Sequence, residues 1–377
     1  MRNLHIPRYL ATGTALGLGL AVVPTTAGAA TFVPCDTAAL ITAISTANGS
    51  GGGTLNLAPG CTYTLTTAFN GGDAGLPAIT TPITINADGD IIERSTAAGT
   101  PHFFIIRVDG GKLTLNSGTI RGGSTPGDGG GIQNINAGSL TLQSSTVTGN
   151  SAGGVGGGIA TFVNGTVILR ASSVDHNTAA AGFGGGIFSG SALTLQASSI
   201  RSNSGGNGGG VFIGANGKLT MNGGDVSDNA AAGAVGGIFN SGTATVQSAL
   251  VKGNTAAVSA GISNHGTMTL QDTTVSGNTA TAGNAGGIAN ISTATLTLEA
   301  STVSGNTANS PGATGGGLFN LGTATLIAST VTDNSADTAP GGIYNKAGTV
   351  GLIATAVADN HPTNCAGSPT PVPGCSG

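Results

Sequence analysis

The chain has 377 residues, of which 69 are glycine, 7% are charged and 3% are aromatic, and its formal net charge is −4. An average globular domain carries roughly 25% charged residues and about 7% glycine, so this composition excludes an ordinary globular domain. Nucleic-acid binding requires a cationic surface, and the few basic residues form no cluster, which excludes a nucleic-acid partner.

Residues 1–29 have the three parts of a secretory signal peptide. Arg2 and Arg8 precede a short apolar stretch, and small residues follow it up to Ala29. This order predicts export and cleavage after Ala29. A membrane anchor is the alternative, but the apolar stretch is short and contains Gly and Thr. No later apolar run could span a bilayer, so we expect a secreted protein without a membrane span, either free or associated with the cell surface.

Residues 30–52 are expected to form an N-terminal cap. The segment has apolar residues at Leu40, Ile41 and Ile44, and Asp36 is a suitable N-cap residue for a short helix. Such a helix would cover the open core of the first coil of a solenoid.

The four cysteines lie at the two ends of the exported chain. An even number fits an oxidising compartment and allows three pairings. We expect the pairs Cys35–Cys61 and Cys365–Cys375, which would hold the two ends of an elongated body. The sequence has no CxxC motif for metal or redox chemistry, and no cysteine lies where a Cys/His pair could act as a nucleophile.

Residues 53–360 are expected to form the β-helix: after irregular coils at residues 53–110, three short motifs repeat in the same order, at a spacing of roughly 24–30 residues that is typical of a solenoid. The motifs are Gly-Gly-aliphatic, Leu-Thr-Leu and Ser/Thr-x-Val-x-x-Asn, and residues 286–308 contain all three. Apolar residues alternate within each motif and β-branched residues dominate, which predicts strands. The expected fold class is therefore all-β, a single right-handed parallel β-helix with three short strands per coil. Val147, Val174 and Ile200 should then lie directly above one another.

An asparagine follows the third apolar position of each repeat by three residues. Buried amides can satisfy one another along a stack, so we expect a structural ladder. Its members are Asn150, Asn177, Asn203, Asn229, Asn254, Asn278, Asn306, Asn334 and Asn360.

Residues 361–377 are rich in Pro and Gly and contain two cysteines, so we expect them to cover the C-terminal end of the β-helix.

The Gly-Gly-aliphatic units, each followed by a unit that ends in Asn, resemble the repeats of the polymorphic outer membrane protein family. More broadly, the chain is similar to right-handed parallel β-helix proteins of the pectin-lyase-like class, and its exported start and PVPGC ending resemble secreted actinobacterial members. The resemblance implies an adhesin-like passenger domain. Family members carry a C-terminal β-barrel, and the sequence up to Gly377 shows neither barrel strands nor a cell-wall sorting tail, so free secretion is expected.

Enzymes of the pectin-lyase-like class act on acidic polysaccharides through clustered Asp, Arg and His residues. If this chain were an enzyme, its only dense group of charges would have to supply the site, and Arg94 and Arg121 are one coil apart and could share a face. The group contains no Asp-Asp pair or Gly-His-Gly run, so we expect solvated charges and no catalytic residue. The residues are Asp88, Asp90, Glu93, Arg94, His102, Arg107, Asp109 and Arg121.

Five aromatic residues follow the Gly-Gly-aliphatic motif, and alternation would turn them outward into a column that could bind sugar rings or a partner protein. The alternative is that they fill a corner between strands. They are Phe188, Phe212, Phe239, Phe319 and Tyr344. His265 occupies a corner of the same region and is expected to be a turn residue.

A Thr-x-Thr motif occurs on four successive coils, at residues 243–245, 267–269, 295–297 and 323–325. A regular hydroxyl array is similar to the surface of ice-binding solenoids, although Thr also simply suits strands.

The sequence therefore favours a secreted, non-catalytic β-helix scaffold that is adhesin-like or binds glycans at a surface. The alternative is a polysaccharide lyase or glycoside hydrolase, and a third interpretation is an ice-binding solenoid. The expected partner is an extracellular polysaccharide or a surface protein. No cofactor or metal is expected, and the sequence leaves the oligomeric state open.

Overall fold

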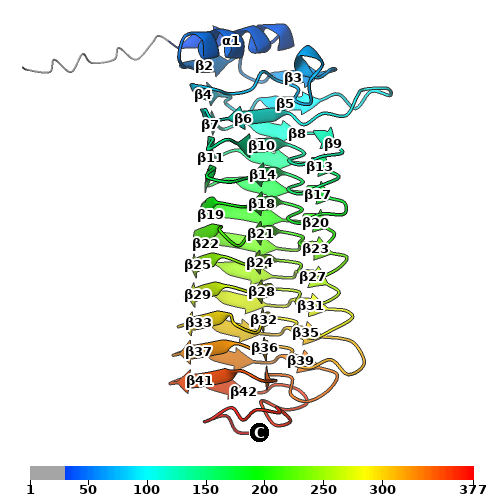
Figure 1. The fold of residues 1–377 in the computed structure, drawn as a ribbon, viewed down its shortest axis with the longest axis vertical. Coiled ribbons are helices and arrows are strands. Elements are labelled where there is room, and N and C mark those ends of the chain that lie inside the picture. Colours follow the sequence, from blue (N-terminus) through cyan, green and yellow to red (C-terminus); the bar gives the residue numbers. More distant parts are fainter. Residues whose placement is uncertain (1–29) are drawn as a thin grey trace, which may run out of the picture.

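The computed structural model describes residues 30–377. The predicted signal peptide, residues 1–29, lies outside the described residues. The described chain is a right-handed parallel β-helix whose coils stack along one long axis, with one helix across the N-terminal end and an irregular segment across the C-terminal end (Figure 1). The predicted fold class is confirmed.

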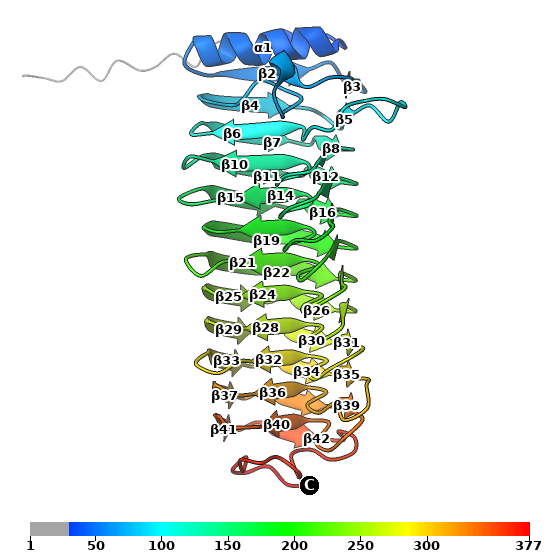
Figure 2. The same ribbon diagram turned by 45° about the vertical axis from the view of Figure 1, so that its right-hand side comes forward.

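Each repeat coil has four short strands that lie on four faces of the rod, which we number in chain order. Face 1 is a 10-stranded sheet built from the Gly-Gly-aliphatic motifs and one preceding strand (Figure 2). Its strands are β6 (Ile106–Asp109), β10 (Ile132–Ile135), β14 (Ile159–Thr161), β18 (Ile187–Ser189), β21 (Val211–Ile213), β24 (Ile238–Asn240), β28 (Ile262–Asn264), β32 (Ile288–Asn290), β36 (Leu318–Asn320) and β40 (Ile343–Asn345).

Faces 2 and 3 belong to one 23-stranded sheet, because β19 (Ala192–Arg201) and β22 (Lys218–Ser227) run without a break from one face to the other. The other face 2 strands, from the Leu-Thr-Leu motifs and the coils before them, are β1 (Thr31–Val33), β2 (Gly53–Leu57), β4 (Pro82–Asn86), β7 (Lys112–Asn116), β11 (Ser139–Gln143), β15 (Thr166–Arg170), β25 (Thr243–Gln247), β29 (Thr267–Gln271), β33 (Thr295–Glu299), β37 (Thr323–Ile327) and β41 (Thr349–Ile353). The other face 3 strands are β3 (Thr62–Leu65), β5 (Ile91–Arg94), β8 (Thr119–Arg121), β12 (Thr146–Thr148), β16 (Ser173–Asp175), β26 (Leu250–Lys252), β30 (Thr274–Ser276), β34 (Thr302–Ser304), β38 (Thr330–Thr332) and β42 (Ala356–Ala358).

Face 4 adds a strand of only two residues to the three predicted strands of each coil. It is a 9-stranded sheet, and every strand after the first begins directly after the ladder Asn of its repeat. Two residues are too few to show an alternating pattern, so sequence periodicity could not reveal it. Its strands are β9 (Ser124–Thr125), β13 (Ser151–Ala152), β17 (Thr178–Ala179), β20 (Ser204–Gly205), β23 (Ala230–Ala231), β27 (Thr255–Ala256), β31 (Thr279–Ala280), β35 (Thr307–Ala308) and β39 (Ser335–Ala336).

Equivalent apolar side chains form continuous columns inside the rod. Val147 pairs with Val174 and Val174 with Ile200 in the parallel register, and all three side chains are fully buried. The predicted superposition is therefore confirmed. Burial of such columns supplies the hydrophobic stabilisation that a single coil lacks.

In most coils the Gly-Gly-aliphatic motif begins with glycine because the next coil approaches too closely for a side chain; Ala260 is the exception. A Cβ atom at Gly157 would lie 2.4 Å from the carbonyl oxygen of Gly185 in the next coil. Real Cβ atoms do not approach other atoms so closely, so only glycine fits at this step.

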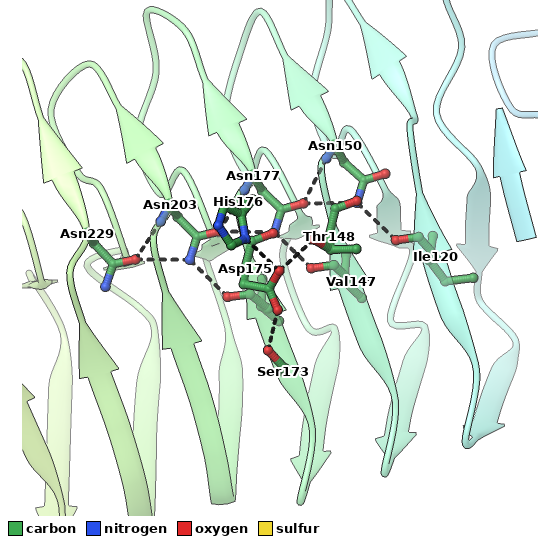
Figure 3. Close-up of polar contacts among 11 residues, drawn as sticks. Ile120, Val147, Thr148, Asn150, Ser173, Asp175, His176, Asn177, Asn203 and Asn229 are labelled. Atoms are coloured by element: carbon green, nitrogen blue, oxygen red, sulfur yellow. Dashed lines mark hydrogen bonds and ion pairs between the residues drawn. The ribbon is translucent and has the colours of Figure 1, made fainter. Parts of the chain in front are cut away.

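The predicted Asn ladder runs along the corner between faces 3 and 4 (Figure 3). Asn177 donates its side-chain amide to the amide oxygen of Asn203 at 3.0 Å and to the carbonyl of Val147 in the previous coil at 2.9 Å. The amide oxygen of Asn203 also accepts the backbone N–H of Asn177. Each buried amide is thus satisfied by its neighbours above and below, as expected for a structural ladder.

A second Asn ladder, which sequence reasoning missed, lies at the end of the face 1 strands. Asn240 donates to Asn264 at 2.9 Å, and the chain of amides continues through Asn290 and Asn320 to Asn345. Its signal was the Asn that lies two residues after the aliphatic residue of most Gly-Gly-aliphatic motifs; Thr161, Ser189 and Ile213 are the exceptions.

Both ends of the rod are covered. Helix α1 (Thr37–Gly49) is N-capped by the Asp36 carboxylate, which accepts the backbone N–H of Ala39 at 2.7 Å. Leu40 and Ile44 point into the core and are fully buried. At the other end, Val372 is buried against the last coil. A short 3-10 helix (Phe69–Gly71) lies in the irregular coils near the N-terminus.

Both predicted disulfides are present. Cys35–Cys61 joins the start of α1 to the segment before β3, and Cys365–Cys375 closes the C-terminal segment. The described residues contain no helix with the length and apolar character that a bilayer crossing requires.

Candidate functional site

The outer surface of face 1 carries a row of stacked aromatic rings, which we call the aromatic row. Phe188, Phe212 and Phe239 project from β18, β21 and β24, and they occupy neighbouring positions in the parallel register. Ring centroids are 5.3 Å apart between Phe188 and Phe212 and 4.7 Å apart between Phe212 and Phe239, with interplanar angles of 9° and 15°. All three side chains are partly exposed.

The stacking direction determines whether a ligand meets the faces or the edges of the aromatic rings. The rings lie over one another along the rod, so each ring covers the face of the next, and ring edges point outward. The row is therefore a continuous apolar ridge. The separate stacking platforms that the sequence suggested are absent within it.

His265 extends the aromatic row and is more than a turn residue. Its ring lies 4.6 Å from Phe239 at an interplanar angle of 19°, and Nε2 lies 3.0 Å from the Ser263 hydroxyl. Desolvation lowers the pKa of His265 from its ordinary value. A ring that is held neutral stacks on Phe239 without placing a charge on the ridge.

The predicted aromatic column is not continuous. Ser263 and Ala289 occupy the next two positions on face 1, so Phe319 and Tyr344 form a separate pair with centroids 5.4 Å apart. Phe319 is only 8% exposed, which matches the alternative that it fills a corner.

Two aromatic residues of the row were missed by sequence reasoning. Phe162 lies in the turn after β14 and contacts Phe188, and Phe183 lies in the loop before β18 and contacts Phe212. Phe162 also lines a surface hollow with exposed Val163 and the amides of Asn136 and Asn164. Both aromatics lie outside the repeated motif, so no periodic signal marked them.

Most of the charged residues between 88 and 121 are dispersed, but Glu93, Arg94 and Arg121 line one surface hollow together with Thr148. Arg107 projects from face 1 and forms an ion pair with Asp73 at 2.7 Å. Glu93 and Arg121 form another ion pair at 2.7 Å on face 3. Surface pairs of this kind contribute little to stability and offer no acid–base chemistry.

Arg94 and Arg121, which the sequence suggested could share a face, line the same hollow but are not partners in the register. The register places Arg121 beside Glu93, one residue away from Arg94. The Arg94 guanidinium instead donates to the carbonyl oxygens of Thr100 and Pro101, each at 2.7 Å, and so holds the loop that follows β5.

The remaining members of the group are also dispersed. Asp88 is exposed in a turn, Asp90 is buried and accepts the backbone N–H of Cys61 at 2.7 Å, and Asp109 accepts the Asn136 amide at 2.7 Å. His102 lies 2.9 Å from the Ser124 hydroxyl. None of these contacts pairs an acid with a base across a cleft.

A polar cluster that the sequence analysis did not predict lies on face 3. The Asp175 carboxylate accepts hydrogen bonds from the hydroxyls of Thr148 and Ser173, and it lies 2.9 Å from Nδ1 of His176 (Figure 3). Asp175 is mostly buried, whereas the His176 side chain is 67% exposed. The signal was Asp-His before Asn177, a dipeptide that no other repeat has at this position.

Electrostatics keep this carboxylate ionised. Burial alone would raise the pKa of Asp175, but the hydrogen bonds from His176, Ser173 and Thr148 outweigh it and lower the pKa below its ordinary value. An ionised Asp175 orients the His176 ring and leaves Nε2 open to solvent. Arg201 is exposed at the position next to Asp175 in the following coil.

Other chemistry finds no support in residues 30–377. No three His, Cys, Asp or Glu side chains come together there in a way that could hold a metal ion. A hollow between β1 and α1 is lined by residues such as Phe32, Ala43 and Leu55, and its lining has no titratable side chain.

Comparisons with known proteins identify the fold and no family. No protein-family profile matches the sequence, and no curated protein matches it. Among solved structures, the A-module of the mannuronan C-5 epimerase AlgE6 from Azotobacter vinelandii is similar, with a TM-score of 0.50 and 16% sequence identity over 85% of this chain and 94% of that chain. At this identity the similarity concerns the β-helix architecture alone.

Proposed function

We propose that this protein is an extracellular scaffold that binds polysaccharides along face 1. The observation that carries the proposal is the aromatic row, a partly exposed apolar ridge on a protein with 3% aromatic residues. Exposed apolar surface of this kind is uncommon on monomeric proteins unless it contacts a ligand or partner.

Several features support a carbohydrate ligand for this ridge. The C–H faces of sugar rings are apolar and pack well against aromatic side chains. The hollow at the N-terminal end of the row combines Phe162 and Val163 with the amides of Asn136 and Asn164, a mixture that suits C–H groups and hydroxyls together. The structural neighbour is a mannuronan epimerase, so this architecture also serves a protein that acts on a polysaccharide.

The charge of face 1 indicates which polysaccharides suit it. Arg107 is the basic residue at the N-terminal end of this face, and Asp73 already neutralises it. The protein carries a net charge of −4, so no electrostatic attraction favours a polyanion. The proposed ligand is a polysaccharide with few charges.

The two disulfides and the signal-like N-terminus support a site outside the cell, and retention on cells or matrix would agree with the adhesin-like role that the repeat resemblance implies.

Replacement of the row tests the proposal. In the variant Phe188→Ser, Phe212→Ser, Phe239→Ser, binding to neutral glycans on an array is expected to weaken at least about tenfold, which corresponds to roughly 1.4 kcal/mol. Phe32→Ser is the matched control, because Phe32 is 64% exposed on β1 at the N-terminal end. Thermal melting shows whether each variant is folded. Equal binding by a folded triple variant would refute the proposal.

A second candidate function is acid–base catalysis on an acidic polysaccharide at Asp175 and His176. The observation that favours it is an imidazole oriented by a buried carboxylate, with Nε2 free and Arg201 exposed at the neighbouring position. Nε2 could accept a proton from substrate, and Arg201 could bind a carboxylate. If the protein is an enzyme, Asp175 and His176 are better candidates for its active site than the charged residues between 88 and 121.

Assays of acidic polysaccharides for new reducing ends or unsaturated products test this second function. Activity that disappears in His176→Gln and persists in His102→Gln would support it. Absence of products from a panel of uronate polymers would leave the non-catalytic scaffold as the function.

A further inference from the structure

The outer surface of face 2 carries a regular array of threonines from β25 to β41, which we call the Thr array. One column has a fully aligned register from strand to strand and consists of exposed side chains. It contains Thr243, Thr267, Thr295, Thr323 and Thr349. A second aligned column, two residues further along each strand, contains Thr245, Thr269, Thr297 and Thr325.

The array has two fixed spacings. Neighbouring parallel strands lie about 4.8 Å apart, and residues two apart on a strand are separated by about 6.7 Å. Figure 1 shows β25, β29, β33, β37 and β41 stacked one above another along one side of the rod. β-Branched side chains have a restricted χ1, so the methyl and hydroxyl groups repeat with little rotational freedom.

The hydroxyls of this array are available to solvent. The contact within the array is one long hydrogen bond, from Thr349 to Thr323 at 3.4 Å. The third outward column is Gln247, Gln271, Glu299 and Ile327, so Glu299 is the one charged side chain on these strands of face 2. Coils nearer the N-terminus differ, because Lys112, Arg170 and Lys218 lie on the same face.

We propose that the Thr array binds an ordered surface of water, that is, ice. A repeating set of methyl and hydroxyl groups at fixed spacings can hold water molecules in a repeating arrangement, and the rigid backbone lets many weak contacts form together. Multiple simultaneous contacts convert weak single interactions into strong attachment.

The chemistry of the array disfavours other partners. Sugar rings pack on aromatic side chains, and the face 2 strands from β25 to β41 contain none. Protein interfaces have an apolar or aromatic centre, whereas the outward apolar side chains on this part of face 2, Ile327 and Ile353, lie at its C-terminal edge. Polyanions require cations, and none lies on these strands.

Thermal hysteresis and ice-crystal shape test the proposal on the purified full chain. The wild-type protein is expected to separate the freezing and melting temperatures, to shape ice crystals and to partition into growing ice. The variant Thr269→Lys, Thr297→Lys places two charges at the centre of the array and is expected to lose most of the hysteresis.

The matched control is Ser276→Lys, Ser304→Lys, which places the same charges on face 3 of the same coils, on β30 and β34. It should retain the hysteresis, and circular dichroism should show that both variants are folded. Absence of hysteresis, crystal shaping and ice partitioning in the wild type would overturn the proposal, as would equal loss in both variants. Glycan binding along face 1 is measured separately, so the two proposals can fail independently.

Discussion

Asp175 shows how one carboxylate can be buried on a rod that has few charges. The exposed fraction of its side chain is 10%, and burial disfavours the ionised form. Hydrogen bonds from Thr148, Ser173 and His176 favour that form more strongly, so the pKa of Asp175 is lowered in the folded protein. The folded state therefore gains stability from the ionised group.

The stability that Asp175 contributes should depend on pH in a defined direction. Its folded pKa lies below the ordinary value of 3.8, so the contribution is fully present above pH 3.8 and is lost as the pH falls through the folded pKa. Wild type is expected to melt at a higher temperature than Asp175→Asn at pH 6, and the difference should shrink below pH 3.8.

Thr148→Val removes one of the three hydrogen bonds to the Asp175 carboxylate, so it should have part of the effect of Asp175→Asn. Its melting temperature should fall between those of wild type and Asp175→Asn at pH 6. A difference between wild type and Asp175→Asn that grows as the pH falls would contradict the account.

At the scale of elements, the Asn ladder couples each coil to the next. Asn203 accepts the backbone and side-chain N–H groups of Asn177 and donates to the carbonyl of Val174 and to the amide of Asn229. All these groups are buried. Removal of one Asn side chain would therefore leave buried donors and acceptors without hydrogen-bond partners or water. The ladder thus fixes the register between strands on faces 3 and 4.

Replacement of Asn203 by Ala is expected to destabilise the fold strongly. The two N–H groups of Asn177 lose their acceptor, and each unpaired buried group costs about 1–3 kcal/mol. The expected loss is therefore about 2–6 kcal/mol, measured by denaturant unfolding. Asn222→Ala is the control, because Asn222 is exposed on β22, and it should change stability by less than about 0.5 kcal/mol.

The whole molecule is a linear stack in which each coil contacts its neighbours. A different structural element covers each end of the stack. Helix α1 buries Leu40 and Ile44 over the first coil, and the disulfide-closed segment after β42 covers the last. Stability in such a stack is close to a sum of coils and coil–coil interfaces. A whole coil should then be removable, provided the register is kept.

Deletion of residues 262–287 tests this expectation, because Ile262 and Ile288 are direct partners in neighbouring coils. Joining Gly261 to Ile288 keeps every face in register, so the shortened protein should fold with a melting temperature a few degrees lower. Deletion of residues 262–274 joins Gly261 to Val275 and puts a face 3 strand in the place of face 1. That variant should fail to fold, as measured by circular dichroism, and a cooperative transition in it would contradict the modular account.

The repeat, the strand type, the capping helix with its N-cap Asp36, and the Asn ladder could all be predicted from the sequence. Each is a local pattern repeated in every coil, and stacked coils must place equivalent residues together because only that arrangement buries the apolar columns and satisfies the amides. The disulfide pairs were also predictable, since the cysteines lie at the two ends alone.

Where the repeat pattern is irregular, the contacts between coils could be learned from the folded structure but not from the sequence. The register pairs Arg121 with Glu93 and leaves Arg94 one residue away, so Arg121 forms an ion pair with Glu93 while Arg94 binds carbonyl groups of the loop after β5. Phe162 and His265 join the aromatic row from turns, and turn geometry leaves no periodic trace in the sequence. Coil lengths differ from repeat to repeat, so the alignment of one coil on the next is a property of the folded stack.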